Sequence, residues 1–177
     1  MEVEYKITAA SDSANENLIT NDEIQSFLRL PEADPEIAIL RDAAIRMAEK
    51  YMNRAITEQS GKIRSNVHSF RIPYIPLSGM VNITGVKSDN EEVLSYKFDH
   101  ITGYFSVSRE TSLPIVIDVS YEVESSIPAA IKLAIMKIIA TEYEMRESVS
   151  VGVSVTEAPN SAMRILDLYR LPSGGIY

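Results

Sequence analysis

The sequence predicts an α+β fold: a small helical bundle with an inserted antiparallel β-sheet of four or five strands. Near both ends of the chain, apolar residues recur at spacings of three and four, which is typical of helices that bury one face. Between about residues 61 and 124, short runs rich in Val, Ile, Tyr and Phe alternate with turn residues, which is typical of antiparallel strands. A length of 177 residues suits one domain.

We therefore expect a single domain over residues 1–177, since no clear linker divides the chain. Its expected parts are an N-terminal arm (1–19), helices (20–58), the inserted β region (59–125), a long helix with a loop and a short helix (126–170), and a C-terminal tail (171–177).

The arm begins with a strand pattern of period two, in which Val3, Tyr5 and Ile7 share one face. The polar stretch AASDSANEN that follows is expected to be a linker. Such an arm can add a strand to a neighbour's sheet edge, and Ile176 and Tyr177 of the tail can anchor in a partner's pocket. Disordered ends are the equally weighted alternative for both segments.

Two helices are expected in residues 20–58. Thr20 and Glu23 form the sequence signature of a capping box, which marks a helix N-terminus. A second, amphipathic helix is expected from Asp34 to about Ile56. Its apolar stripe comprises Ile37, Leu40, Ala44, Met47 and Tyr51, and its polar face comprises Arg41, Asp42, Arg46, Glu49 and Lys50.

A long helix over residues 128–146 is apolar on most of its circumference. Its first apolar side comprises Ile131, Ile135, Ile138 and Ile139, and its second comprises Leu133, Met136, Ala140 and Tyr143. A helix of this kind must be covered on most sides. The sheet of the same chain or a neighbouring subunit can supply the cover, and both interpretations stay open. A loop at 148–158 and a short last helix are expected next.

The composition argues against several classes of function. With 25 acidic and 17 basic residues the formal charge is −8, and no Lys or Arg cluster suited to binding phosphates is present. Cysteine is absent, which excludes disulfides and thiolate chemistry. Neither His68 nor His100 lies near a nucleophile or metal-binding motif. We expect no catalytic residue, metal or cofactor, and no membrane span, because no apolar window is long enough.

Five stretches, in this order, resemble one known family: LITNDEIQSFLRL, DAAIRMAEKYMNRAI, IPLSGMVNITGVKSDNEE, IPAAIKLAIMKIIATEYEMRE and AMRILDLYR. From about Leu18 to Arg170 the chain resembles the head–tail connector proteins of long-tailed double-stranded DNA bacteriophages, which are also called adaptor or head-completion proteins. The segments 148–158 and 171–177 match no pattern of that family.

The resemblance implies a structural virion protein at the head–tail joint, assembled in the cytoplasm of the bacterial host, and not an enzyme. Such proteins form a ring of about twelve copies beneath the portal protein, in which each copy offers two different patches to its neighbours. The ring extends the channel for passing DNA without reading its sequence, and it supports the next neck or tail protein. The candidate subunit and partner contacts are Val3, Tyr5, Ile7, Met136, Ile139, Tyr143, Ile176 and Tyr177.

Three other functions stay open. The chain can be another neck or tail-completion protein of the same assembly. It can also be a module that binds a small ligand or a peptide on its β-sheet, with a pocket lined by Tyr74, Tyr96, Phe98, Tyr104 and Phe105. An enzyme that uses His100 with nearby carboxylates ranks last.

Overall fold

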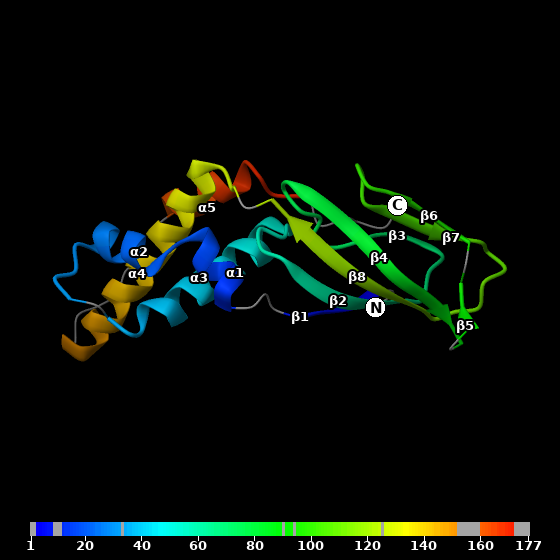
Figure 1. Ribbon diagram of the computed structural model, residues 1–177, viewed down its shortest axis with the longest axis horizontal. Coiled ribbons are helices and arrows are strands. Elements are labelled where there is room, and N and C mark those ends of the chain that lie inside the picture. Colours follow the sequence, from blue (N-terminus) through cyan, green and yellow to red (C-terminus); the bar gives the residue numbers. More distant parts are fainter. Residues whose placement is uncertain are drawn as a thin grey trace. The chain divides into compact units, whose positions relative to one another are not determined.

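The computed structural model describes residues 3–8, 12–32, 34–89, 91–93, 95–124, 126–151 and 160–171 (Figure 1). The chain divides into two compact units. The sheet unit comprises Met1–Ser11, Asn53–Glu124 and Leu171–Tyr177, and the helical unit comprises Asp12–Met52 and Ser125–Arg170. That the whole chain forms one domain stays a prediction.

The sheet unit contains two antiparallel sheets, which confirms the α+β class. The described strands are β1 (Val3–Thr8), β2 (Gln59–Ser65), β3 (Ser69–Arg71), β4 (Gly79–Ser88), β5 (Glu91–Glu92), β6 (Tyr96–Asp99), β7 (Tyr104–Val107) and β8 (Ile115–Val123). Five of them form one sheet in the order β1-β2-β8-β4-β5, and three form a second sheet in the order β3-β7-β6. The expected sheet of four or five strands is therefore present, and the three-stranded sheet is additional.

The core of the sheet unit lies where inward side chains of both sheets meet. Strands β2 and β8 alternate between buried and more exposed residues, as expected for strands that bury one face. Ile63 and Ile117 from the larger sheet join Phe70 and Phe105 from the smaller one in a single buried cluster. The hydroxyl of the buried Tyr121 donates to the Pro73 carbonyl at 2.9 Å, which satisfies the one polar group that this ring carries into the core.

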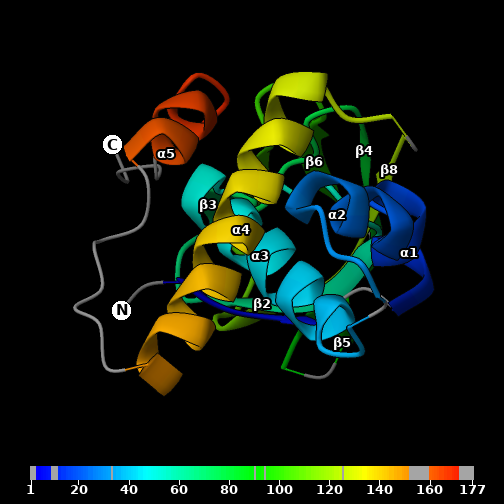
Figure 2. The same cartoon turned by 90° about the vertical axis from the view of Figure 1, so that its left-hand side faces the viewer.

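The helical unit is built from five helices within the described residues. They are α1 (Asp12–Leu18), α2 (Asn21–Leu28), α3 (Ile37–Met52), α4 (Ala129–Val151) and α5 (Asn160–Asp167). The capping box before α2 is confirmed: the Thr20 side chain accepts from the Glu23 amide, and the Glu23 carboxylate accepts from the Thr20 amide. Helix α4 packs against α3 and α5 (Figure 2).

The expected polar linker after the arm is helical from Asp12 onward, so that prediction was wrong for residues 12–17. The tertiary fold overrides the polar composition here. Asn15 and Leu18 are buried, and the Glu16 carboxylate forms an ion pair with Arg41 of α3. These contacts stabilise a helix of seven residues that would not be stable alone.

Helix α3 ends four residues earlier than expected. Asn53 adopts a left-handed backbone, with φ of 53°, and this conformation stops a right-handed helix. The following backbone is held elsewhere: the Ala55 amide donates to the Tyr74 carbonyl at 3.1 Å, and the Ala55 carbonyl accepts from Leu77 at 3.3 Å. These hydrogen bonds satisfy polar groups that a longer helix would have used.

The faces of α3 also differ from the expectation. Arg41 and Glu49, expected on the polar face, are only 3% and 2% exposed, whereas Met47, expected on the apolar stripe, is 40% exposed. Arg41 is buried because its guanidinium meets the carboxylates of Glu16 and Asp42 and donates to the side-chain oxygen Oδ1 of Asn21. Buried charges persist only with such partners.

Helix α4 continues to Val151, so the first residues of the expected loop at 148–158 are helical. Residues 152–159 lie outside the described residues, as do residues 172–177 of the tail. In the part of the chain that is described, no helix is long and apolar enough to cross a membrane.

Candidate interaction surfaces

The two apolar sides of α4 have different surroundings. Ile135 and Ile139 on the first side are fully buried. On the second side Leu133 is 42% exposed, and Met136 and Tyr143 are half-buried. The chain therefore covers one side of α4 and leaves the other only partly covered. Of the expected contact residues on this helix, Met136 and Tyr143 are partly accessible, while Ile139 lies inside the chain.

Helix α3 presents a second accessible apolar face, which we call the α3 stripe. It consists of Ile39, Ala43 and Met47, three exposed residues at spacings of four, which place them on one face of the helix. Ile39 is 69% exposed. The small Ala43 lies between two longer side chains along this face.

Polar contacts hold the helices around these faces. The Arg146 side chain on α4 bonds Asp34 at 2.8 Å and also Glu36, and the pKa of Asp34 is lowered because the guanidinium stabilises its carboxylate. Lys132 on α4 meets Glu23 on α2 at 2.6 Å and lowers the pKa of that carboxyl in the same way. These contacts orient α4, and Tyr143 of its second side takes part in them, since the Arg146 guanidinium lies 4.6 Å from the centroid of its ring.

The N-terminal strand β1 pairs with β2 of its own chain, in the register Val3 with Ser65 and Ile7 with Gly61. Val3 and Ile7 are half-buried and pack against the sheet-unit core. Tyr5 is 50% exposed and stands edge-on to Tyr74, with ring centroids 5.7 Å apart. The strand pattern is thus confirmed, and contact of this strand with a neighbour stays a prediction. Ile176 and Tyr177 lie outside the described residues.

The loop between β6 and β7, which we call the hairpin tip, carries the most exposed of the large apolar side chains that the structure describes. Ile101 there is 91% exposed. The Asp99 carboxylate accepts from the amides of Ile101 at 2.9 Å and Thr102 at 3.4 Å, and from the Thr102 hydroxyl at 2.6 Å. These bonds lower the pKa of Asp99, the Thr102 hydroxyl contributing most. The tip is therefore a fixed turn.

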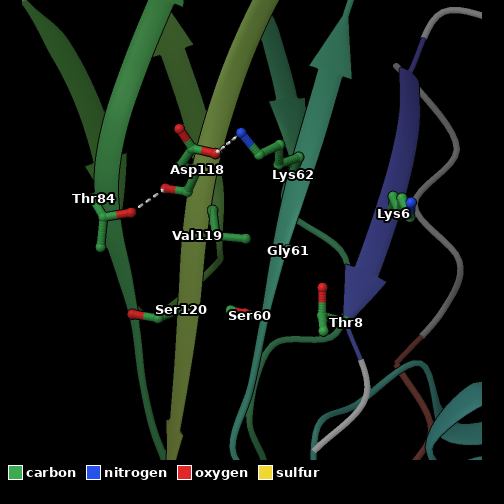
Figure 3. A pocket seen from close by; sticks show the side chains of 9 residues that line it. All are labelled: Lys6, Thr8, Ser60, Gly61, Lys62, Thr84, Asp118, Val119 and Ser120. Carbon is green, nitrogen blue, oxygen red and sulfur yellow. Dashed lines mark hydrogen bonds and ion pairs between the residues drawn. The ribbon is translucent and has the colours of Figure 1, made fainter.

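The outward face of the larger sheet holds a shallow groove (Figure 3). Lys6 and Lys62 lie opposite each other on β1 and β2, and the Lys62 ammonium lies 3.1 Å from Asp118 on β8. The Thr84 hydroxyl donates to the Asp118 carbonyl at 3.2 Å. Charges of both signs and several hydroxyls line the groove, so it lacks the apolar enclosure of a small-molecule site.

The aromatic residues considered for a ligand pocket partly fill the core instead. Phe105 is fully buried, with its ring centroid 5.5 Å from that of Phe70 and 5.6 Å from that of Tyr96. Phe98 is half-buried beside the same core. Rings in mutual contact leave no room between them for a ligand, which weakens the binding-module interpretation.

The two histidines take structural positions. His68 Nε2 lies 2.9 Å from the Thr111 carbonyl oxygen. The ring of the exposed His100 packs edge-on to Phe98 at 4.7 Å. Among the described residues no group of three His, Cys, Asp or Glu side chains could hold a metal ion.

Comparison with known proteins identifies the family. The family described as "Head completion protein" matches residues 17–171 of this chain. The chain is therefore a member of that family. No curated protein sequence matches it.

Solved structures with the same fold come from a phage-like particle. One is the neck of a native gene transfer agent particle computed with C12 symmetry (TM-score 0.69), and another is the neck of the empty particle computed with C6 symmetry (TM-score 0.67). A third is the virion of the native particle (TM-score 0.64). In each case the identity is 15%, and the match covers 98% of this chain and 99% of the other.

Sequence reasoning missed the hairpin tip and the α3 stripe. A signal for the tip is present: DHITG places an isoleucine among residues that favour turns, where an aliphatic side chain has no core to enter. The α3 stripe carried a partial signal, because Ile39 falls outside the apolar face expected for this helix, whereas Met47 was assigned to that face.

Proposed function

We propose that this chain is a structural protein of the head–tail joint in a phage or phage-like virion. Copies of the chain form a ring beneath the portal protein, extend the channel through which DNA passes, and support the next neck or tail protein. The observation that supports this proposal most is the family match over residues 17–171, together with full-length similarity to a neck chain solved with C12 symmetry. The proposed ring contains about twelve copies, in keeping with the C12 symmetry of that neck.

The chain's own surfaces suit this role. Two accessible apolar faces, the second side of α4 and the α3 stripe, are available for contacts with other proteins, which exposed apolar patches often mark. A formal charge of −8 suits a channel wall that does not hold passing DNA, because phosphate binding requires clustered positive charge. The proposed role is structural and includes no catalytic step.

The test is negative-stain electron microscopy of the full-length protein at high concentration, with its mass measured by light scattering. We expect annular particles with a central hole wide enough for duplex DNA and a mass near twelve protomers. The same protein mixed with the portal protein of its own particle tests templated assembly. A chain that stays monomeric alone and does not bind the portal ring would refute the proposal.

The alternative function, that of another neck or tail-completion protein, differs from the proposed one in the partner that the chain binds. Binding to the end of an isolated tail, and not to the portal, would favour that alternative. The same electron microscopy, performed with purified tails, gives the answer.

A further inference from the structure

A polar cluster links the end of α4 to the start of α3. We propose that this cluster, formed by Asp34, Glu36, Tyr143 and Arg146, is a latch: when it opens, residues 140–151 of α4 leave their position while the rest of the helical unit stays folded. The inference concerns a single protomer and does not depend on the ring or on the role in a virion. It gives the chain a closed and an open state.

Apolar burial along α4 stops at Ile139. From Ala140 to Arg146, no side chain is buried in the described structure, and Tyr143 and Met145 are only half-buried. Helices in proteins are stabilised mainly by the packing of an apolar face, so this part of α4 receives little of the stabilisation that the first part has. The buried residues of the first part are Ile131, Ala134, Ile135, Ile138 and Ile139.

The sequence of the terminal segment adds little helix stability of its own. Arg146 is the only basic residue between positions 138 and 151, and the last turn has none, so no cation complements the negative end of the helix dipole there. Serine and valine alternate over residues 148–151, and both are weaker helix formers than alanine or leucine. A segment of this kind stays helical only while other contacts hold it.

Arg146 contacts every other member of the latch. Its guanidinium donates to Asp34 Oδ2 at 2.8 Å and to the Glu36 carboxylate. The same group lies 4.6 Å from the centroid of the Tyr143 ring, and the Tyr143 side chain hydrogen-bonds the Asp34 carboxylate. Because these contacts share one guanidinium, losing it opens the whole cluster at once.

The α3 side of the latch is fixed. Asp34 Oδ1 accepts from the Glu36 amide at 2.9 Å, and the Asp34 carbonyl accepts from the Ile37 amide at 3.2 Å. Ile37, the first residue of α3, is fully buried. These bonds do not involve α4, so they survive when the latch opens, and the moving part is the end of α4.

The latch is also in contact with water. The side chains of Arg146 and Glu36 are 35% and 57% exposed. Ion pairs at such positions are weak and are screened by salt. Opening the latch is therefore a local transition of low free energy, whereas separating the buried residues of α4 from α3 unfolds the unit. In the open state Tyr143 and Met145 become accessible to other proteins.

Hydrogen exchange of the full-length protein, measured by mass spectrometry where light scattering shows monomers, tests the latch. In the wild type we expect the amides of residues 140–151 to be protected, but less than those of 131–139. In Arg146→Gln the amides of 140–151 should exchange about tenfold faster than in the wild type. The amides of 131–139 should stay at least about a hundredfold better protected than those of 140–151.

The matched control is Arg164→Gln, which removes the same charge from an exposed position on α5 of the same unit and should leave exchange in 140–151 unchanged. Salt gives a second readout. Raising sodium chloride from about 0.05 M to about 1 M should speed exchange of 140–151 in the wild type, because it screens the latch, and should have no such effect in Arg146→Gln.

Three results would overturn the proposal. The first is an Arg146→Gln variant whose terminal segment exchanges as slowly as that of the wild type. The second is equal protection of 131–139 and 140–151, which would mean that α4 opens only as a whole. The third is a wild-type segment that exchanges at the rate of an unstructured chain, which would mean that the latch holds nothing.

Discussion

The unequal burial of the two sides of α4 leads to a quantitative prediction for Ile135→Ala and Leu133→Ala. The two residues are close on one helix, yet Ile135 is fully buried and Leu133 is 42% exposed. Each substitution removes three carbon atoms, and the difference in helix propensity between Leu and Ile is only a few tenths of a kcal/mol, which is smaller than the difference expected from burial. The difference in stability therefore reports burial.

The expected losses follow from the burial. Three buried carbons at about 0.8 kcal/mol each give about 2.4 kcal/mol for Ile135→Ala, and the residual cavity raises the loss to about 3–4 kcal/mol. Leu133 has only about half of its transfer free energy to lose and leaves no closed cavity, so about 1 kcal/mol is expected. For a chain of this size the melting temperature should fall by about 10 °C and about 3 °C respectively.

The assay is thermal and urea unfolding of the full-length variants, at concentrations where light scattering shows monomers. Equal losses for the two variants would refute the assignment of a buried and an accessible side. Repeating the Leu133→Ala measurement under conditions where rings form gives a further comparison, because a larger loss there means that a neighbour covers this side.

Three further predictions concern particular contacts. Gly103→Ala should lower the free energy of unfolding by at least about 1 kcal/mol, because φ is 70° and Ile75 occupies the space of the new methyl group; a chemical melt measures it, and an unchanged midpoint would contradict the packing of the turn. Arg41→Met should lower the free energy of unfolding by about 2 kcal/mol, because removing the buried guanidinium leaves its carboxylate partner without a compensating charge. A loss smaller than that of an exposed arginine variant would contradict the burial of Arg41. The free energy of unfolding should fall as the pH drops below the ordinary pKa of a carboxyl group, because folding lowers the pKa of Glu23 and Asp34 and so favours their charged forms. The urea midpoint measured between pH 6 and pH 2 checks this. Its dependence on pH should become weaker when both residues are replaced by the corresponding amides.

Helices and strands were predicted correctly from the sequence wherever the local signals agree with the tertiary structure. The capping box at Thr20 depends on residues three positions apart, and the strands between residues 79 and 123 carry their own turn residues. Helix α1 was missed because Glu16 pairs with Arg41, which is distant in the sequence, and because the burial of Asn15 and Leu18 depends on the tertiary fold. No local pattern shows such a contact.

The exposed apolar surfaces were harder to predict from the sequence than the fold. Periodicity identifies apolar residues on a helix face, but not whether another element covers that face. Ile139 and Met136 carry equally strong apolar signals, yet one is fully buried and the other half-buried. Likewise, Glu49 was assigned to the polar face because an isolated carboxylate is rarely buried, whereas the neighbouring Arg46 compensates it.

The placement of β1 has a consequence for the order in which the newly made chain can fold. Val3 at the start of the chain pairs with Ser65, and Ser65 pairs in turn with Ile115. Strand β1 leaves the ribosome before its partner β2 and must wait for it, and the middle of that sheet is complete only when β8 has emerged. Pairings so distant in sequence slow folding and leave unpaired strand edges exposed meanwhile. Chains interrupted before residue 115 should accordingly aggregate during synthesis, so that joints are built only from finished copies.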